Sequence, residues 1–169
     1  MAQDIFDRLK QDHEKHRQLI AAIQATSGAS DERKALFKQF KTDAMAHAAA
    51  EEGTLYVAMM EDPDIRQDAQ HSVKEHADIG MKFVELDEMD MASPGWLNKF
   101  NSLAKEYTHH IDEEEEEKFP KAEEELGEGK AVELKSDFEE RKPVEIERVQ
   151  DGADVPEIKK AMEEEEGAK

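Results

Sequence analysis

Histidine and glutamate recur in this sequence at a spacing that suits metal ligation. In "HAAAE" (47–51) and in "HIDEE" (110–114), a histidine precedes a glutamate by four residues. Side chains four residues apart lie on the same face of a helix, about one turn from each other. An imidazole nitrogen of His47 and a carboxylate of Glu51 can therefore reach one metal site from a single helix, and so can those of His110 and Glu114.

Two more histidines extend each pair into a repeat. His13 lies 34 residues before His47, and His76 lies 34 residues before His110. An offset of 63 residues therefore relates the two sets, and it also relates several apolar positions of the two halves. Burying such polar groups inside a helical protein is costly unless they are paired or bind a metal. The six candidate metal ligands are His13, His47, Glu51, His76, His110 and Glu114.

Together these side chains supply four imidazole nitrogens and two carboxylates. If each glutamate bridges two metals, each metal receives four donor atoms. Six-coordinate iron would keep two further positions, one for a shared oxo or hydroxo bridge and one for an exogenous ligand. Structural zinc fits less well because it closes at four ligands. Nitrogen and oxygen ligands without sulfur favour iron, with manganese or zinc as substitutes. The expected cofactor is a centre of two iron ions.

Four helices are needed to position these residues. Turn-forming stretches at 26–31, 61–64, 91–96 and 126–129 divide the first 126 residues into four segments of roughly 25 to 30 residues, rich in helix formers. Apolar residues recur in steps of three and four, as in a stripe that faces a bundle interior. Histidine interrupts each stripe near its middle. We expect an all-α fold: an antiparallel up-down four-helix bundle with an internal pseudo-twofold repeat of helical hairpins.

The composition limits the classes of function. The chain has 23 basic and 43 acidic residues, a formal net charge of -20, which argues against nucleic acids and anionic membranes as partners. Cysteine is absent, so thiolate metal sites and cysteine nucleophiles are excluded. We see no signal-peptide pattern or membrane-spanning run and expect a cytoplasmic protein.

Leu, Ile, Val and Phe make up only about 18% of the residues, a proportion typical of disorder. Helical periodicity and a stabilising metal site favour a folded domain instead.

Two further residues on the inward stripes are candidates for a role beside the metals. His16 lies about one turn after His13, and Tyr107 about one turn before His110. The repeat places Ile79 opposite His16, which favours packing or a position behind the ligands over a fifth ligand. Tyr107 is placed to pack in the core, to donate a hydrogen bond to a bound oxygen species, or to act as a substitute ligand.

The remaining histidines and the neighbouring glutamates have simpler readings. His71 and His109 fall off the inward stripes, and we expect both on the surface. Glu52 and Glu115 directly follow the two candidate carboxylates, and we expect them to be solvated or to form ion pairs between helices. The other glutamates of "EEEEE" (113–117) form a solvated face.

Residues 127–169 form a C-terminal extension without histidine. Apolar residues within 129–142 predict a short helix docked on the bundle. After Pro143 the periodicity is weak, and we expect an extended segment that lies along the domain or contacts a protein partner. The acidic end, 163–169, is expected to be partly flexible. Two regions follow: the bundle at 1–126 and the extension at 127–169.

The chain resembles the hemerythrin-like domains of the HHE cation-binding family, whose helices carry the pattern H…HxxxE…H…HxxxE. The matching stretches are "LKQDHEKH", "HAAAEEGTLY", "VKEHADI" and "HHIDEEEEEKFP", within about residues 1 to 126. The resemblance implies the same six ligands. Oxygen-carrying members have a fifth histidine on the third helix, where this chain has Ser72 and Gly80 four residues either side of His76. They also use aspartate five residues after the last histidine, where this chain has Glu115.

Three functions remain open from the sequence. The first is a non-haem di-iron protein that binds or senses O2, NO or peroxide at an open iron position. The second is a redox enzyme, a peroxide scavenger or a ferroxidase, that uses the same metals. The third is an iron-handling or interaction module in which the metal is mainly structural. Whether the protein is an enzyme stays an open question at this stage.

Overall fold

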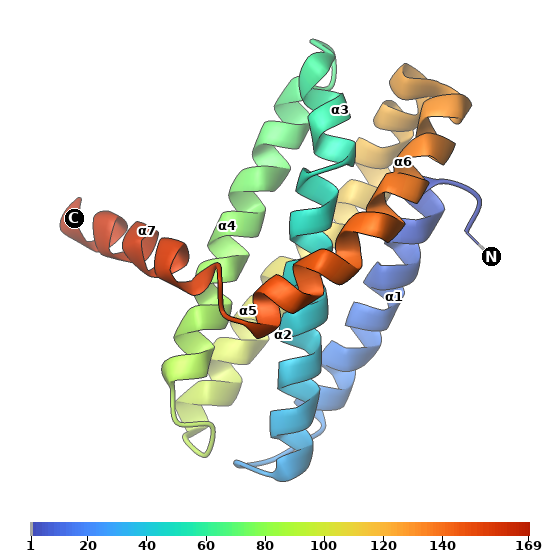
Figure 1. Ribbon diagram of the computed structural model, residues 1–169. Coiled ribbons are helices and arrows are strands. Elements are labelled where there is room, and N and C mark those ends of the chain that lie inside the picture. The colour runs from blue at the N-terminus through green and yellow to red at the C-terminus, as the bar shows by residue number, and fades with distance from the viewer. Residues whose placement is uncertain (1) are drawn as a thin grey trace.

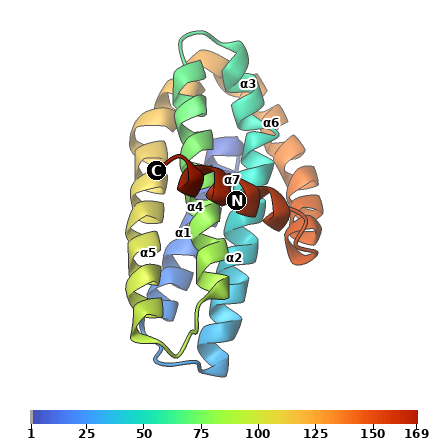
Figure 2. The ribbon, with the colours of Figure 1, turned by 90° about the vertical axis from the view of Figure 1, so that its left-hand side faces the viewer.

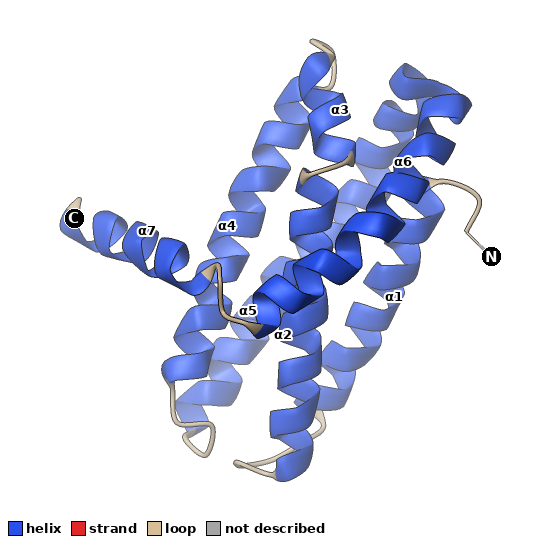
Figure 3. Cartoon of the chain, in the orientation of Figure 1, coloured by secondary structure: helices blue, strands red, loops and turns tan. Residues whose placement is uncertain are grey.

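The computed structural model describes residues 2–169, and these residues form helices and connecting turns without any strand (Figure 3). None of the helices in this range is long and apolar enough to cross a membrane. In chain order the elements are α1 (Ile5–Gln24), α2 (Asp31–Glu52), α3 (Leu55–Glu61), α4 (Arg66–Glu88), α5 (Pro94–Glu113), the π-helix η1 (Glu114–Lys118), α6 (Phe119–Gln150) and α7 (Val155–Gly167).

Short polar side chains begin three of the long helices. Asp4 accepts a hydrogen bond from the backbone N–H of Asp7 at the start of α1, and Ser30 accepts one from Arg33 at the start of α2. Ser93 caps α5, with Pro94 at its first position. Such caps satisfy backbone donors that have no partner within the helix. The sequence marks these starts clearly.

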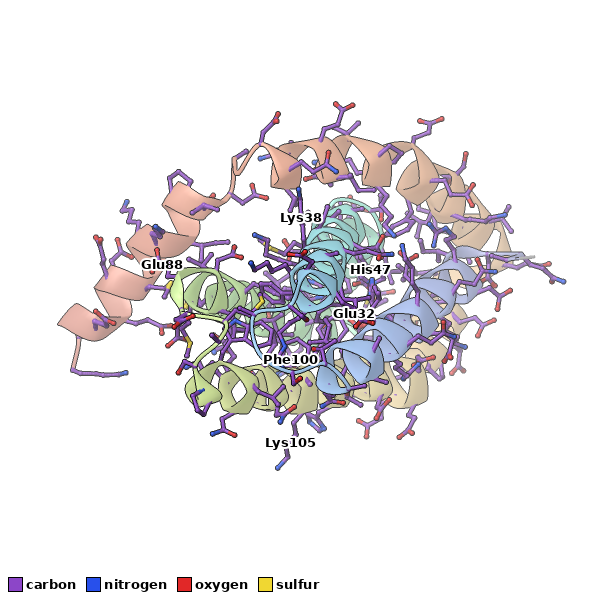
Figure 4. All side chains as sticks on the ribbon, turned by 90° about the horizontal axis from the view of Figure 1, so that it is seen from below. Glu32, Lys38, His47, Glu88, Phe100 and Lys105 are labelled. Carbon is purple, nitrogen blue, oxygen red and sulfur yellow. The ribbon has the colours of Figure 1, made fainter. Side chains whose placement is uncertain are left out.

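The long helices α1, α2, α4 and α5 lie alongside one another as a helical bundle (Figures 1 and 2). Helix α1 packs on α2 and α5, and α4 packs on α5 and α2. The short helix α3 follows α2 and packs on α4. Seen from below in Figure 4, His47 and Phe100 lie inside the bundle, whereas Lys105 points outward.

The C-terminal extension is more helical than the sequence predicts. Gly127 has φ 78° and ψ 164°, a conformation that favours glycine, and it divides α6 into two parts. The second part packs against α1 and α2 and continues through Pro143 to Gln150. The expectation of an extended segment after Pro143 is therefore wrong. The acidic end forms α7, which packs against α4 (Figure 1).

Two apolar clusters form the core, one on each side of a polar layer. The first joins the start of α1 to α3 and α6 and includes Phe6, Leu55 and Phe138. The second joins α1, α2, α4 and α5 around Phe40 and Phe100. Aromatic rings give these clusters much of their apolar area, which explains how a chain with few aliphatic residues still has a dry interior.

Candidate metal centre

The six candidate ligands lie together in the interior, between the two apolar clusters. None has more than 8% of its surface exposed, the value for His76, and His13, Glu51 and Glu114 are fully buried. They come from five elements: His13 from α1, His47 and Glu51 from α2, His76 from α4, His110 from α5, and Glu114 from the first position of η1.

Glu114 spans two histidines with its two oxygen atoms. Its Oε2 lies 3.4 Å from Nε2 of His13, and its Oε1 lies 3.3 Å from Nε2 of His110. The Tyr56 hydroxyl donates a hydrogen bond to Oε1. Burial opposes ionisation, but the nearby imidazoles, above all that of His110, lower the pKa of Glu114. This carboxylate is placed as a charged bridge between the two halves of the site.

Glu51 lies between the two remaining histidines. Its Oε2 is 3.5 Å from Nε2 of His47 and 3.6 Å from Nε2 of His76. Burial, together with the charges of Glu114 and Glu52, raises the pKa of Glu51 well above its ordinary value. Burial and these charges therefore favour the protonated form of this carboxyl group when no cation is nearby.

His76 and His110 face each other with their Nε2 atoms 3.0 Å apart. The Nδ1 atom of His76 is 2.9 Å from Oε1 of Glu52, and that of His110 is 3.1 Å from Oε1 of Glu75. When both Nδ1–H groups donate to these carboxylates, both Nε2 atoms carry lone pairs, which repel unless a proton or a cation lies between them. Two nitrogens each about 2.1 Å from one ion, at a right angle, would be about 3.0 Å apart.

His13 and His47 also have carboxylates beside their Nδ1 atoms. Their rings lie 5.0 Å apart between centroids. Nδ1 of His47 is 2.9 Å from Oδ2 of Asp12, and Nδ1 of His13 is 3.7 Å from Oε2 of Glu115. Every candidate imidazole therefore has a carboxylate behind Nδ1 and directs Nε2 to the centre. The 63-residue offset relates Asp12 to Glu75, and Glu52 to Glu115.

Sequence reasoning missed Asp12 and Glu75, although each directly precedes a candidate histidine and the two share the 63-residue offset. It assigned Glu52 and Glu115 to solvent or to ion pairs. Glu115 does pair with Arg17, but it also faces His13. Extending the repeat comparison to the polar neighbours of the histidines would have found all four carboxylates.

Cations hold these carboxylates in their charged form. Asp12 lies 2.6 Å from Nη1 of Arg8 and 2.8 Å from Nζ of Lys142. Glu75 lies 3.1 Å from Nζ of Lys118. Burial raises the pKa of both acids, but the opposing hydrogen bonds with His47 and His110, and the lysine charges, leave the pKa of Asp12 well below its ordinary value and that of Glu75 at about 2.

Several buried polar atoms at the centre have no hydrogen-bond partner within residues 2–169. Leaving a buried polar atom unpaired costs free energy, so such atoms are rare in folded proteins. Their concentration between two bridging carboxylates and four imidazoles fits a site that binds cations. The atoms are both nitrogens of His13, Nε2 of His47, both carboxylate oxygens of Glu51 and Oε2 of Glu114.

Both helices that carry a carboxylate change course just after it. Helix α2 ends at Glu52, whereas α5 continues directly into the π-helix η1, which begins at Glu114. These changes bring equivalent aromatic rings over the histidines: Tyr56 stacks on His76 at 5.5 Å, and Phe119 stacks on His13 at 5.9 Å. A π-turn is rare and often marks a functional site. Here it positions a ring against an imidazole of the centre.

His16 and Tyr107 lie beside the six ligands but not among them. Nε2 of His16 is 2.5 Å from Oδ2 of Asp43, and its Nδ1 is 2.6 Å from the Tyr107 hydroxyl. Both ring nitrogens of His16 are therefore engaged. Asp43 in turn contacts Lys15 at 2.8 Å, so a hydrogen-bonded chain leads from Tyr107 to a half-exposed lysine. Neither residue is placed as a fifth nitrogen or oxygen ligand.

A cavity of about 590 Å³ opens beside the centre, between α2, α4 and the C-terminal helices. His47, His76 and Tyr107 line its inner end, together with apolar groups such as Phe83. Helix α7 covers part of it, with Ile158 of that helix beside Gly80 of α4. Of the six candidate ligands, His47 and His76 border this cavity.

The two remaining histidines of the chain, His71 and His109, lie outside this centre. His109 is exposed, as the sequence predicts. His71 is 54% exposed, but its Nε2 lies close to two glutamates, 3.4 Å from Glu75 and 3.7 Å from Glu113.

Comparisons with known proteins agree with this geometry. A comparison with curated proteins gives no match. Among solved structures, the chain is similar to the crystal structure of a hemerythrin HHE cation-binding domain-containing protein, the Rv2633c homolog from Mycobacterium kansasii. The TM-score is 0.75 at 22% identity, over 94% of this chain and 93% of that one, which shows a shared fold. Residues 4–122 match the family described as Hemerythrin HHE cation binding domain, and the chain belongs to this family.

Proposed function

We propose that this protein holds a non-haem di-iron centre, at which one open iron position binds O2 or a related small ligand such as NO or peroxide. The observation that carries the proposal is the set of buried, unpartnered nitrogen and oxygen atoms that converge between two histidine pairs. Four imidazoles and two carboxylates without sulfur are a donor set that suits iron.

The two carboxylates support two ions better than one. Glu114 reaches one histidine of each pair with a different oxygen, and Glu51 lies between the other two. The proposed ligands are therefore His13 and His47 for one ion, His76 and His110 for the other, and Glu51 and Glu114 for both. We also propose that the bundle consists of two helical hairpins related by a pseudo-twofold axis, since the 63-residue offset relates ligands, the carboxylates behind them and the stacked rings.

When bound, iron supplies reversible electron transfer and a Lewis-acidic position for a small ligand. The chain's own residues supply the surroundings. Phe40 and Phe83 keep the interior beside the cavity dry. Tyr107 is buried, lines the cavity and hydrogen-bonds His16, so its hydroxyl is placed to meet a ligand that enters through the cavity.

Metal content and optical spectra test this proposal. Chelator-treated protein is loaded anaerobically with Fe2+, and iron per chain is measured by elemental analysis; we expect two. Air or NO is then added and the absorption spectrum is recorded, with a reversible change as the expected result. Binding of a single iron, or the same iron content in a His110→Ala/Glu114→Ala variant, would contradict the proposal.

A second candidate function is a redox enzyme that consumes peroxide. The hydrogen-bonded chain from Tyr107 through His16 and Asp43 to Lys15 favours it, because such a chain links the cavity to solvent and can move protons. Rapid turnover of hydrogen peroxide with iron retained would support this function over reversible ligand binding. A stable spectrum under excess peroxide would exclude it.

A further inference from the structure

The second part of α6, after Gly127, lies beyond the family match at residues 4–122, yet its side chains reach the candidate ligands. Phe138 and Lys142 are four residues apart and therefore lie on one face of the helix. Both are buried, and the Phe138 ring packs edge-on against His47 at 5.8 Å between centroids. The buried residues that precede Lys142 on α6 are all apolar, so a buried lysine at this position needs an explanation.

The Lys142 ammonium lies between two acids. Its Nζ is 2.8 Å from Oδ2 of Asp12 and 3.2 Å from Oδ1 of Asp43, and a buried ammonium is tolerated only when it is paired in this way. Each acid also faces an imidazole. Oδ2 of Asp12 is 2.9 Å from Nδ1 of His47, and Oδ2 of Asp43 is 2.5 Å from Nε2 of His16. One lysine therefore supports the acids beside a candidate ligand and beside a neighbouring histidine.

The second half of the repeat has the same contact, built from another element. Oε1 of Glu75 lies 3.1 Å from Nζ of the buried Lys118 and 3.1 Å from Nδ1 of His110. In both halves, a buried ammonium and an imidazole thus meet at one carboxylate oxygen. The 63-residue offset relates the acids and the histidines but not the lysines, since it places Leu55 opposite Lys118, and Lys142 lies outside the repeat. Two unrelated positions supply the same contact, which favours a role for the ammonium at this centre.

The two acids decide which imidazole nitrogens carry protons. Burial lowers the pKa of His16 and of His47, so both rings are neutral. Because a charged carboxylate only accepts hydrogen bonds, His47 donates from Nδ1 to Asp12, and the lone pair of its Nε2 faces Glu51 and the centre. His16 likewise donates from Nε2, which leaves its Nδ1 to accept from the Tyr107 hydroxyl.

We propose that Lys142 is a positioning residue of the metal centre. Its ammonium holds Asp12 and Asp43 in place, and through these acids it fixes the tautomers of His47 and His16. The inference rests on the proposed metal centre, because its effect is to keep Nε2 of His47 free for an ion. It also gives the C-terminal helix α6 a role in the chemistry of the centre, although α6 supplies no ligand.

The direction of the change in metal affinity separates positioning from simple electrostatics. An ammonium repels a nearby cation, so on charge alone Lys142→Met should bind Zn2+ more tightly. Without the ammonium, however, the facing oxygens of Asp12 and Asp43, no more than about 6 Å apart, repel each other and move from the imidazoles. Loss of such an acceptor weakens metal binding by about 10- to 100-fold, and we expect Lys142→Met to bind Zn2+ about tenfold more weakly.

Zinc titration against a competing chelator, together with nitrogen NMR, tests the proposal on the full chain. Long-range proton–nitrogen spectra of the metal-free protein show which ring nitrogen carries the proton. The wild type should have the Nδ1–H tautomer at His47 and the Nε2–H tautomer at His16. In Lys142→Met, at least one of these rings should become a mixture of tautomers. Lys142→Arg keeps the charge and can donate to both acids, so it should restore both tautomers and most of the zinc affinity.

Lys130→Met is the matched control. It removes the same charge from a partly exposed lysine of the same helix, which pairs only with Glu133. We expect wild-type tautomers and wild-type zinc affinity in this variant. Thermal melts in EDTA check that each variant folds, and Lys142→Gln takes the place of Lys142→Met, under the same criteria, if the methionine variant does not.

The outcomes separate the role of Lys142 from the metal centre itself. Weaker zinc binding with a lost tautomer in Lys142→Met, and wild-type values in Lys130→Met, support the proposal. Unchanged or tighter binding in Lys142→Met, weaker binding with both tautomers intact, or an equal loss in Lys130→Met would overturn it. A wild type that binds no zinc would refute the metal centre, whereas tautomers that depend on Lys142 would still support its role in positioning the imidazoles.

Discussion

Replacing Glu51 by leucine should stabilise the metal-free protein while it destroys the metal site. Both Glu51 oxygens are buried without a hydrogen-bond partner among the described residues, and its pKa is raised by burial and by Glu114. Each unpaired buried polar atom costs about 1–3 kcal/mol. Removing both oxygens should increase the free energy of unfolding of the metal-free protein by about 2–6 kcal/mol. Imperfect packing of leucine reduces this gain by up to about 1.5 kcal/mol. A net gain of about 2 kcal/mol should raise Tm by roughly 4–8 °C in a chain of this size.

Glu114→Leu is the matched control and should act in the opposite direction. This carboxylate accepts the Tyr56 hydroxyl and lies against His13 and His110. Leucine would leave that hydroxyl buried without its partner, at a cost of about 1–3 kcal/mol. Tm of the metal-free protein should therefore fall. A Glu51→Gln variant keeps the shape but cannot ionise, and it should lie between wild type and Glu51→Leu.

Far-ultraviolet circular dichroism melts in EDTA, and again with excess Zn2+ after EDTA removal, measure both effects. Metal at about 1,000 times its dissociation constant should stabilise the wild type by about 4 kcal/mol, and both leucine variants should lose most of this gain. Glu51→Leu could instead lower the Tm of the metal-free protein as much as Glu114→Leu does. That result would show that the unpaired oxygens of Glu51 do not destabilise the folded state. If zinc stabilises Glu51→Leu as much as wild type, Glu51 is not a ligand.

The sign of the pH dependence gives an independent check on Glu51. A group whose pKa is raised in the folded state supports folding below its unfolded pKa, and this support is lost as pH rises toward the folded value. Metal-free wild type should therefore lose stability as pH rises above about 4.5, and Glu51→Leu should lack this loss. The advantage of the leucine variant should be larger at pH 8 than at pH 5. An advantage that shrinks with pH would contradict the assignment.

Three further predictions concern the groups around the ligands. Asp12→Ala removes the acceptor behind His47 and should weaken metal binding by about 10- to 100-fold in a zinc titration, whereas unchanged affinity would show that the pair only packs. Tyr107→Phe should keep two metals per chain but slow peroxide consumption by about 100-fold or more if the hydroxyl moves protons, and an unchanged rate would exclude that role. Asp43 has a pKa lowered by its hydrogen bond with His16 and by nearby lysines, against burial, so its contribution is present above about pH 4 and lost as pH falls. Asp43→Asn should therefore cost about 2 kcal/mol at pH 7 and flatten the acid limb of a stability–pH curve, and a parallel curve would refute it.

The sequence predicts the helices and the clustering of the candidate ligands because both follow from local rules. Helix caps, apolar periodicity and a four-residue spacing are properties of one segment at a time. The 63-residue offset adds the pairing between segments, and it brings all six candidate ligands into one buried cluster. The helix after Gly127 could be predicted only in part. Apolar residues within 129–142 indicate a docked helix, but its continuation through Pro143 to Gln150 depends on packing against α1 and α2.

Polar contacts were predicted least well, because a sequence shows which residues are near in the chain and not which atoms meet. The Tyr56 hydroxyl bonds a carboxylate 58 residues away, and Lys142 reaches Asp12 across 130 residues. Nothing in the spacing of these residues indicates either contact. The four carboxylates beside the imidazoles are a different case, because the 63-residue offset relates them in the sequence. They were missed because only the candidate ligands and the apolar positions were compared across that offset.

The departures from the repeat indicate where a small ligand would meet the proposed centre. The offset pairs Tyr107 with Ala44 and His16 with Ile79, so at each of these positions only one half has a polar residue. Tyr107 and His16 form the hydrogen-bonded chain beside the cavity. These two polar residues interrupt an otherwise apolar cluster, and buried polar groups persist only when they are paired. In the proposed centre the matched positions would hold the metals, and the two unmatched polar residues form a hydrogen-bonded chain beside the cavity. A ligand should therefore bind on the Tyr107 side, which is also the side where the cavity opens to His47 and His76.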